Sequence, residues 1–313
     1  MLTSLIIINI MERTEQAADE VCGYCGKAEV DDVKLKKCAC NLVKYCSIDC
    51  QKNHRPQHKK VCKKRLAEIH DDNLFSQPDE GYLGECPICC LALPLDLSKS
   101  TIKTCCSKRI CKGCSCANMK RELEQGQHPK CPYCRDPVPE TEMENEIVQK
   151  RLMKRAKAND PIALFNMGVT CFDEGDFVGA FDYFTKAAAL GDAMAHFNLS
   201  IMYHKGEGVE RDEKKKVHHL EEAAIGGHPD ARYNLGAHEG RSGRYDRAVK
   251  HFIIAAKLGD DGSLDQVRKC FHSGVVSKED YAAALRGHQA AVDATKSEQR
   301  DAAYAFLKRN GLL

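Results

Sequence analysis

The cysteines of this 313-residue chain are concentrated in its first half. Seventeen of the nineteen lie at or before Cys134, and only Cys171 and Cys270 follow. In the first half they recur in pairs at short spacings, with histidine among them, which is typical of metal binding rather than of a secreted disulfide framework. The sequence therefore predicts a cysteine-dependent first part, an ordinary second part, and an intracellular protein, cytoplasmic or nuclear, with reduced thiols.

Changes in composition divide the chain into six segments. They are an N-terminal segment (1–21), a first cysteine and histidine cluster (22–62), a linker (63–85), a second cysteine cluster (86–135), a connecting helix (140–158) and a repetitive helical region (159–308). The linker is expected to hold a short helix that frays near Asp71 and Asp72. The apolar stretch at the N-terminus is shorter than the about 20 residues that cross a bilayer. We interpret it as a packed or frayed segment and expect no membrane contact.

The overall charge of the chain gives no support for a nucleic-acid partner. The formal net charge is +2, with 29% charged residues. The basic run "HKKVCKKR" is interpreted as the solvated face of a helix, because no aromatic residues interleave with it to stack bases. Nucleic acid is therefore not an expected partner.

The first cluster contains eight candidate metal ligands in four pairs. The pairs are Cys22 and Cys25, Cys38 and Cys40, Cys46 and Cys50, and His58 and Cys62. Eight ligands suit two tetrahedral zinc sites, and the i, i+4 spacing of the last two pairs places both side chains on one face of a helix. A region this small has too little core to fold unaided, so metal binding is expected to supply much of its folding energy.

The phrases "YCSIDCQ" and "HKKVC" in this cluster resemble a MYND-type zinc finger. The resemblance implies interleaved ligands, with one zinc on the first and third pairs and the other on the second and fourth. Two departures stand out. The second pair is C-x-C where the family has C-x-x-C, and Arg55 occupies the usual position of a tryptophan that serves the family's peptide groove. His54 is left over and is interpreted as a surface residue.

The second cluster contains four cysteine pairs enclosed by the phrases "CPIC" and "CPYC". The pairs are Cys86 and Cys89, Cys105 and Cys106, Cys111 and Cys114, and Cys131 and Cys134. This order resembles a RING finger, whose ligands interleave in a cross-brace. The resemblance implies one site on the first and third pairs and a second site built on the fourth, which makes four zinc ions for the whole chain.

The remaining ligands of that last site are open. The family's usual histidine position holds Lys108, a cation that binds zinc poorly but is able to donate a hydrogen bond to a thiolate. Either Cys105 and Cys106 both bind from an irregular loop, or His128 completes the site. We favour the vicinal pair, which leaves Cys90 and Cys116 as buried free thiols.

The RING resemblance implies a ubiquitin-protein ligase. Such a domain binds a ubiquitin-charged conjugating enzyme and acts by positioning the thioester, without a covalent intermediate. Ile88 and Pro132 match the apolar contacts with the conjugating enzyme, and Arg135 matches the arginine that bridges it to ubiquitin. The alternative is a non-enzymatic, zinc-stabilised scaffold for protein–protein interaction, which the missing histidine favours. No residue is assigned a catalytic role.

The last half of the chain repeats. "PIALFNMG" (161–168), "AMAHFNLS" (193–200) and "DARYNLGA" (230–237) align, and each unit closes on a glycine. Asn166, Asn198 and Asn234 of these units are 32 and 36 residues apart, and periods in this range indicate stacked helical hairpins. The glycines Gly191, Gly227 and Gly259 suit left-handed helix ends. The aspartates Asp160, Asp192 and Asp260 suit N-caps.

This pattern resembles Sel1-like repeats, which are relatives of the tetratricopeptide repeat. The resemblance implies a right-handed α-solenoid that binds other proteins, here an unknown substrate, with a degenerate fourth unit from about Asp260 to Lys308 as a cap. The predicted fold is therefore mostly α, with two small zinc-stabilised fingers followed by an α-solenoid. The scattered histidines of the repeats are expected to pack or to lie on the surface.

Overall fold

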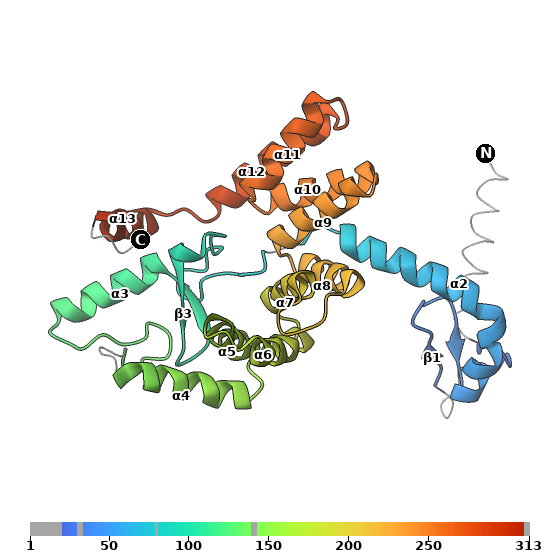
Figure 1. Cartoon of the computed structure of the whole chain (residues 1–313), viewed down its shortest axis with the longest axis horizontal. Helices are drawn as coiled ribbons and strands as arrows, with labels where there is room; N and C mark the ends of the chain where they lie inside the picture. The colour runs from blue at the N-terminus through green and yellow to red at the C-terminus, as the bar shows by residue number, and fades with distance from the viewer. Residues whose placement is uncertain (1–20, 30–33, 79–80, 139–142, 310–313) are drawn as a thin grey trace. The chain divides into compact units, whose positions relative to one another are not determined.

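The chain divides into two compact units, residues 1–74 and 75–313, in a computed structural model that describes residues 21–29, 34–78, 81–138 and 143–309 (Figure 1). The expected packed or frayed segment at residues 1–21 lies outside the described residues, except for Val21. None of the helices in the described ranges has the length and apolar character needed to cross a bilayer.

The first unit is built around a short hairpin and a long helix. Strands β1 (Lys36–Lys37) and β2 (Lys44–Tyr45) pair antiparallel, and helix α2 (Ile48–Phe75) follows. The core cluster of this unit consists of Tyr45 and the buried cysteines Cys22, Cys38 and Cys40, so the core coincides with the candidate metal-binding region. Helix α2 continues past Asp71 and Asp72, where the sequence predicts fraying.

The second finger, residues 86–135, opens the second unit. It contains the 3-10 turn η1 (Leu97–Lys99), strands β3 (Ser100–Lys103) and β4 (Lys108–Cys111), and helix α3 (Lys112–Glu124). The strands form an antiparallel hairpin in which Ser100 pairs with Cys111. Leu93 and Ile110 are buried beside cysteines of the cluster.

Helix α4 (Met143–Lys157) leads from the second finger into four helical hairpins (Figure 1). These are α5 (Pro161–Asp173) with α6 (Phe177–Ala189), α7 (Ala193–Lys205) with α8 (Glu213–Ile225), α9 (Pro229–Arg241) with α10 (Tyr245–Lys257), and α11 (Asp261–His272) with α12 (Lys278–Asp293). Each helix packs on the next along the chain. The predicted fold class, two small fingers followed by a helical solenoid, is confirmed.

The residues predicted to end and to begin the helices of the repeats are also confirmed. Gly191, Gly227 and Gly259 have φ of 85°, 84° and 97°, the left-handed region that ends a helix at low cost only for glycine. The side chains of Asp160, Asp192 and Asp260 accept hydrogen bonds from first-turn amides of α5, α7 and α11. The corresponding position before α9 is His228, which makes no such bond.

The last helix departs from the predicted arrangement. Residues of α13 (Glu298–Arg309) were expected within the capping unit of the solenoid. Instead α13 leaves the stack and packs against α3 of the second finger (Figure 1). The fourth hairpin, α11 and α12, ends the stack without it.

The second finger is docked along an edge of the stack where the first helices of the hairpins begin. At the end of α4, Arg155 donates to Ser107 Oγ (2.6 Å) and to Asp160 Oδ2 (2.9 Å), which ties the β3–β4 turn to the start of α5. Arg109, two residues after Ser107, is close enough to Asp192, the N-cap of α7, for its charge to act on that carboxyl group. Burial raises the pKa of Asp192, and the positive charge of Arg109 opposes that rise.

The linker before the second finger follows the same edge. Tyr82 stacks on His228 with ring centroids 4.3 Å apart, and His228 stacks on Phe197 of α7 at 4.4 Å. The Ser76 carbonyl accepts a hydrogen bond from Arg232 Nη2 (3.3 Å). Burial lowers the pKa of His228 to about 4, so the stacked ring is neutral near pH 7. Finger and repeats are therefore joined by packing as well as by the chain.

A small residue inside each of two hairpins makes room for an aromatic ring. A Cβ atom on Gly168 of α5 would lie 2.6 Å from Phe184 Cε1 of α6, and a Cβ on Gly236 of α9 would lie 2.6 Å from Phe252 Cε1 of α10. Both distances are too short for a real contact. The glycines are required by helix packing, although glycine weakens a helix by about 1 kcal/mol relative to alanine.

We predict that Gly168→Ala destabilises the protein by about 1–3 kcal/mol, because overpacking outweighs the gain in helix propensity. Gly240→Ala in α9 is the matched control, since its added Cβ would meet only Ala248 Cβ at an ordinary 3.8 Å. That variant is expected to be neutral or to stabilise by up to about 1 kcal/mol. Denaturant unfolding of both variants measures the difference, and equal effects would contradict the packing argument.

Candidate metal centres

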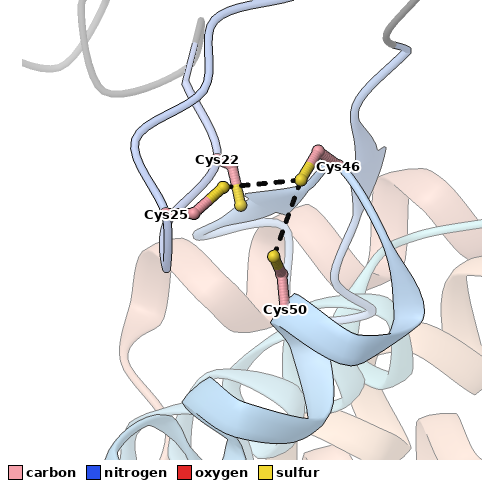
Figure 2. Close-up of side chains that lie close together, drawn as sticks. All are labelled: Cys22, Cys25, Cys46 and Cys50. Carbon is pink, nitrogen blue, oxygen red and sulfur yellow. Dashed lines mark hydrogen bonds between the residues drawn. The ribbon is translucent and has the colours of Figure 1, made fainter.

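The first predicted centre is assembled from two chain segments that α2 brings together. Cys22 and Cys25 come from the turn at the start of the described chain, Cys46 from the residues that lead into α2, and Cys50 from the first turn of α2. Figure 2 shows the four sulfur atoms converging on one point. The distance from Cys46 Sγ is 3.5 Å to Cys25 Sγ and 3.6 Å to Cys50 Sγ.

The second predicted centre lies beside it in the same finger. Cys38 Sγ lies 3.7 Å from Cys62 Sγ, and Cys40 Sγ lies 3.1 Å from His58 Nε2. His58 and Cys62 occupy one face of α2, as their i, i+4 spacing predicts. The C-x-C spacing of the other pair is accommodated by Asn41, whose φ of 60° turns the chain and whose N–H donates to the Cys38 carbonyl (2.9 Å).

The second finger brings its cysteines together in the interleaved order. Its two groups are Cys86, Cys89, Cys111 and Cys114, and Cys105, Cys106, Cys131 and Cys134. In each of the four groups found among the described residues, the candidate ligand atoms lie within 4.8 Å of one another. These are the sixteen residues that the sequence predicts as ligands.

The spacing of the sulfur atoms fits zinc. A tetrahedron with Zn–S bonds of about 2.3 Å separates its sulfurs by about 3.8 Å. Sulfur pairs in the second finger lie at 3.9 Å for Cys89 and Cys111 and for Cys106 and Cys131. A disulfide needs about 2.05 Å, and all cysteines are free.

The electrostatics of the first group in the second finger also require a cation. Hydrogen bonding with the Cys111 side chain, reinforced by backbone N–H groups and opposed by burial, lowers the pKa of Cys86 to about 4. The same side-chain contact, together with burial, raises the pKa of Cys111. The thiols of Cys86 and Cys111 therefore do not ionise together without a counter-charge. Zinc resolves this conflict because its charge stabilises all four thiolates.

The structure favours the vicinal pair over His128 in the last group. Cys105 and Cys106 lie in the turn between β3 and β4, with Cys105 Sγ 3.3 Å from Cys134 Sγ. His128 lies outside the group, with Nδ1 3.2 Å from the Pro129 carbonyl. Lys108 contributes its backbone N–H to the Cys106 sulfur, while its ammonium group lies 5.7 Å from the centre of the Tyr133 ring.

Two side-chain expectations around the fingers are wrong. Cys90 was expected to be a buried thiol, but it is exposed, with a φ of 53°, and closes the turn after Cys89. His54 was expected on the surface, but it is half-buried, with Nδ1 2.9 Å from the Tyr45 hydroxyl and its ring stacked on His58. Arg55, at the usual tryptophan position, is exposed.

The three residues predicted to contact a conjugating enzyme differ in how exposed they are. Ile88 is 42% exposed, and Pro132 is half-buried. Arg135 follows the last cysteine in a left-handed conformation (φ 65°), with its Nη2 atom 2.6 Å from Glu122 Oε1. Arg135 therefore braces its own finger.

Sequence reasoning missed the partner of Arg135. Glu122 of α3 is 1% exposed and also accepts hydrogen bonds from the Lys130 N–H (2.6 Å) and from Asn118 Nδ2 (3.1 Å). The Lys130 N–H bond and the ion pair with Arg135 lower the pKa of Glu122, against burial. The network fixes the last cysteine pair against α3. A glutamate on a helix in a charged sequence gave no signal that it would be buried.

Comparison with protein families identifies two parts of the chain. The MYND finger family matches residues 22–62. The Sel1 repeat family matches residues 161–192, 193–228 and 229–260. The chain therefore carries a MYND finger and three Sel1 repeats.

The chain spans only a limited part of the length of the individual relatives that it matches. "Putative beta-lactamase HcpC" of Helicobacter pylori is 41% identical over 18% of this chain and 19% of its own length. "DAP3-binding cell death enhancer 1" of Rattus norvegicus is 25% identical over 41% of this chain and 33% of its own. Among solved structures, a Sel1 repeat protein from Oxalobacter formigenes aligns with a TM-score of 0.40 and 23% identity, over 49% of this chain and 66% of that chain.

These findings define a class of protein. The MYND finger and the four groups of candidate ligands are consistent with several zinc ions. Sel1 repeats imply protein partners. The chain is a zinc-binding protein with helical repeats. The RING resemblance of the second finger stays a prediction.

We predict four zinc ions per chain. Cys105→Ser and Cys106→Ser are each expected to reduce the zinc content by one ion, since a three-ligand site binds zinc less tightly. His128→Ala and Cys90→Ser are the controls and are expected to retain four. Elemental analysis of the purified variants measures the count. A loss of zinc from His128→Ala would show that the histidine, and not the vicinal pair, completes the site.

Proposed function

We propose that this protein is a non-enzymatic, zinc-stabilised scaffold that holds protein partners on its MYND finger and on its Sel1 repeats. The observation that carries this proposal is the ion pair between Arg135 and the buried Glu122. A RING ligase uses the equivalent arginine to contact ubiquitin. Here the arginine, whose side chain is 49% exposed, pairs with the buried Glu122 of its own finger, which supports a structural role for the second finger.

The docking of the second finger supports the same proposal. Arg155 links the β3–β4 turn to α5, and Tyr82 and His228 link the linker to α9. These contacts make the finger an extension of the repeat surface. A rigid extended surface suits simultaneous contacts with several partners.

We predict that two different partners bind one chain at the same time. Cys25→Ser removes a MYND ligand and is expected to release one partner. Val178→Glu with Tyr245→Glu places charges on two apolar side chains of the repeats that are 70% and 64% exposed, and is expected to release another without unfolding the repeats. Two-step affinity purification of tagged chains measures this, and failure to recover any pair of partners on one wild-type chain would contradict the scaffold.

A RING-type ubiquitin-protein ligase is the second candidate. The observation that favours it is the exposed apolar knuckle surface. Ile88 lies between the first two cysteines at 42% exposure, and Tyr133, next to Pro132 in the last pair, is 47% exposed. This surface suits a ubiquitin-conjugating enzyme, and it remains accessible on the second unit.

The two candidates differ in a ubiquitin-discharge assay. For a ligase, the full chain accelerates discharge from at least one charged enzyme in a broad panel of conjugating enzymes, and Ile88→Ala removes most of that acceleration, since truncating a central apolar contact costs roughly 2 kcal/mol. Leu97→Ala is the matched control, because Leu97 is also 42% exposed and lies outside the knuckles. No acceleration with any enzyme of the panel would exclude the ligase.

Arg135 needs its own control in that assay. Arg135→Ala is expected to weaken ligase activity, but it also breaks the ion pair with Glu122. Glu122→Gln removes the charge of the partner and leaves the arginine in place. If both variants lose activity equally, Arg135 acts through the structure of the finger. If only Arg135→Ala does, the arginine contacts ubiquitin or the enzyme.

A further inference from the structure

The most deeply buried cation of the C-terminal helix reaches into the second finger. Arg300 of α13 is 1% exposed, and its guanidinium group lies beside the first cysteine pair of that finger. Nη2 donates to Cys89 Sγ (3.3 Å) and to the Leu91 carbonyl (3.1 Å), and Nη1 donates to the carbonyls of Ala92 and Thr295, both at 2.7 Å. One side chain thus binds a candidate zinc ligand and the turn that follows it.

The finger is shaped to receive this side chain. Gly113 lies between Cys111 and Cys114 at the start of α3. A Cβ atom there would lie 2.9 Å from Arg300 Cγ and 3.0 Å from Arg300 Cα. The absence of a side chain at residue 113 therefore allows α13 to approach the centre closely. Two positions almost 190 residues apart in the sequence are complementary in shape.

The charge of Arg300 is compensated by the cysteines. No carboxylate of the described residues makes an ion pair with Arg300, whose Nη2 atom lies 3.3 Å from Cys89 Sγ. Burying a guanidinium group without a counter-charge costs several kcal/mol. Four thiolates around Zn²⁺ leave the centre with a net negative charge, which supplies that counter-charge.

We propose that Arg300 is a positioning residue for the zinc centre of Cys86, Cys89, Cys111 and Cys114, and that α13 retains zinc at this centre. The guanidinium group contacts the sulfur of a ligand, Cys89 Sγ, at 3.3 Å. Its hydrogen bond to Cys89 Sγ holds that sulfur in place, its positive charge balances the negative charge of the loaded centre, and its bonds to the Leu91 and Ala92 carbonyls fix the turn that aims Cys89.

The proposal concerns one centre of the four. The other group of the second finger has a nearby arginine, Arg155, but that side chain reaches only the Cys105 carbonyl (3.5 Å) and pairs with Asp160. Its charge is therefore already balanced by a carboxylate. The asymmetry predicts that loss of Arg300 affects zinc at one centre only.

Retention of zinc and docking of α13 are linked. Because zinc binding creates the negative charge that holds Arg300, zinc favours the docked helix, and the docked helix favours zinc by the same free energy. A partner that lifts α13 off α3 would therefore loosen this zinc ion. The proposal holds for both candidate functions, because it rests only on the metal centre.

Zinc transfer from the full-length, zinc-loaded protein to a chromogenic chelator, 4-(2-pyridylazo)resorcinol, tests the proposal. In Arg300→Met, which keeps the length of the side chain and removes its charge and donors, one of the four zinc ions is expected to transfer about 10- to 100-fold faster than in wild type. Arg300→Lys keeps the charge and loses the fork of donors, and is expected to be intermediate. Arg286→Met, at an exposed arginine of α12, is the matched control and is expected to match wild type.

Hydrogen exchange identifies the affected centre. In Arg300→Met, amide exchange is expected to rise in peptides that span residues 86–93 and to stay unchanged in peptides that span 131–138, which belong to the other centre of the finger. Wild-type transfer kinetics in Arg300→Met would overturn the proposal. Faster transfer of two or more ions, or faster exchange in both peptides, would also overturn it, because that pattern indicates general destabilisation.

Discussion

The convergence of four thiolate or imidazole groups on one metal ion is the interaction on which the fingers depend. In the MYND finger the buried core consists of Tyr45 and three of the ligands, Cys22, Cys38 and Cys40, so little apolar surface is left to hold the hairpin against α2. Zinc coordination supplies the missing free energy, and it does so at fixed geometry. In the second finger the same chemistry fixes the β3–β4 hairpin to α3 and creates a negative charge.

That finger, in turn, is part of a larger packed body. Its hairpin and the linker before it lie along the beginnings of α5, α7 and α9, and α13 returns to cover it. The contacts reuse what the repeat already provides: an aspartate N-cap or its histidine counterpart stands at each of these helix starts. Because the repeats are periodic, the starts of their first helices form a row of positions that bind the second finger.

Much of this organisation could be predicted from local patterns. Short cysteine spacings encode which side chains share a turn or a helix face, and glycine and aspartate at fixed intervals encode where helices end and begin. These signals act over a few residues, so they are readable without the fold. At Cys105, Cys106 and His128 the ligand spacing was irregular, so local patterns could not decide which of these residues bind the last zinc ion.

The sequence by itself determined the two zinc fingers, the hairpin repeats and the glycines and aspartates that end and begin their helices. Each of these features depends on neighbours along the chain. Only the tertiary structure decided that Glu122 is buried beneath Arg135, that the second finger is docked on the repeats, and that Arg300 lies against Cys89. The physical reason is the same in each case. A charged residue on a helix has the pattern of a surface residue, and its burial depends on an opposite charge or a set of carbonyls that a distant segment brings to it.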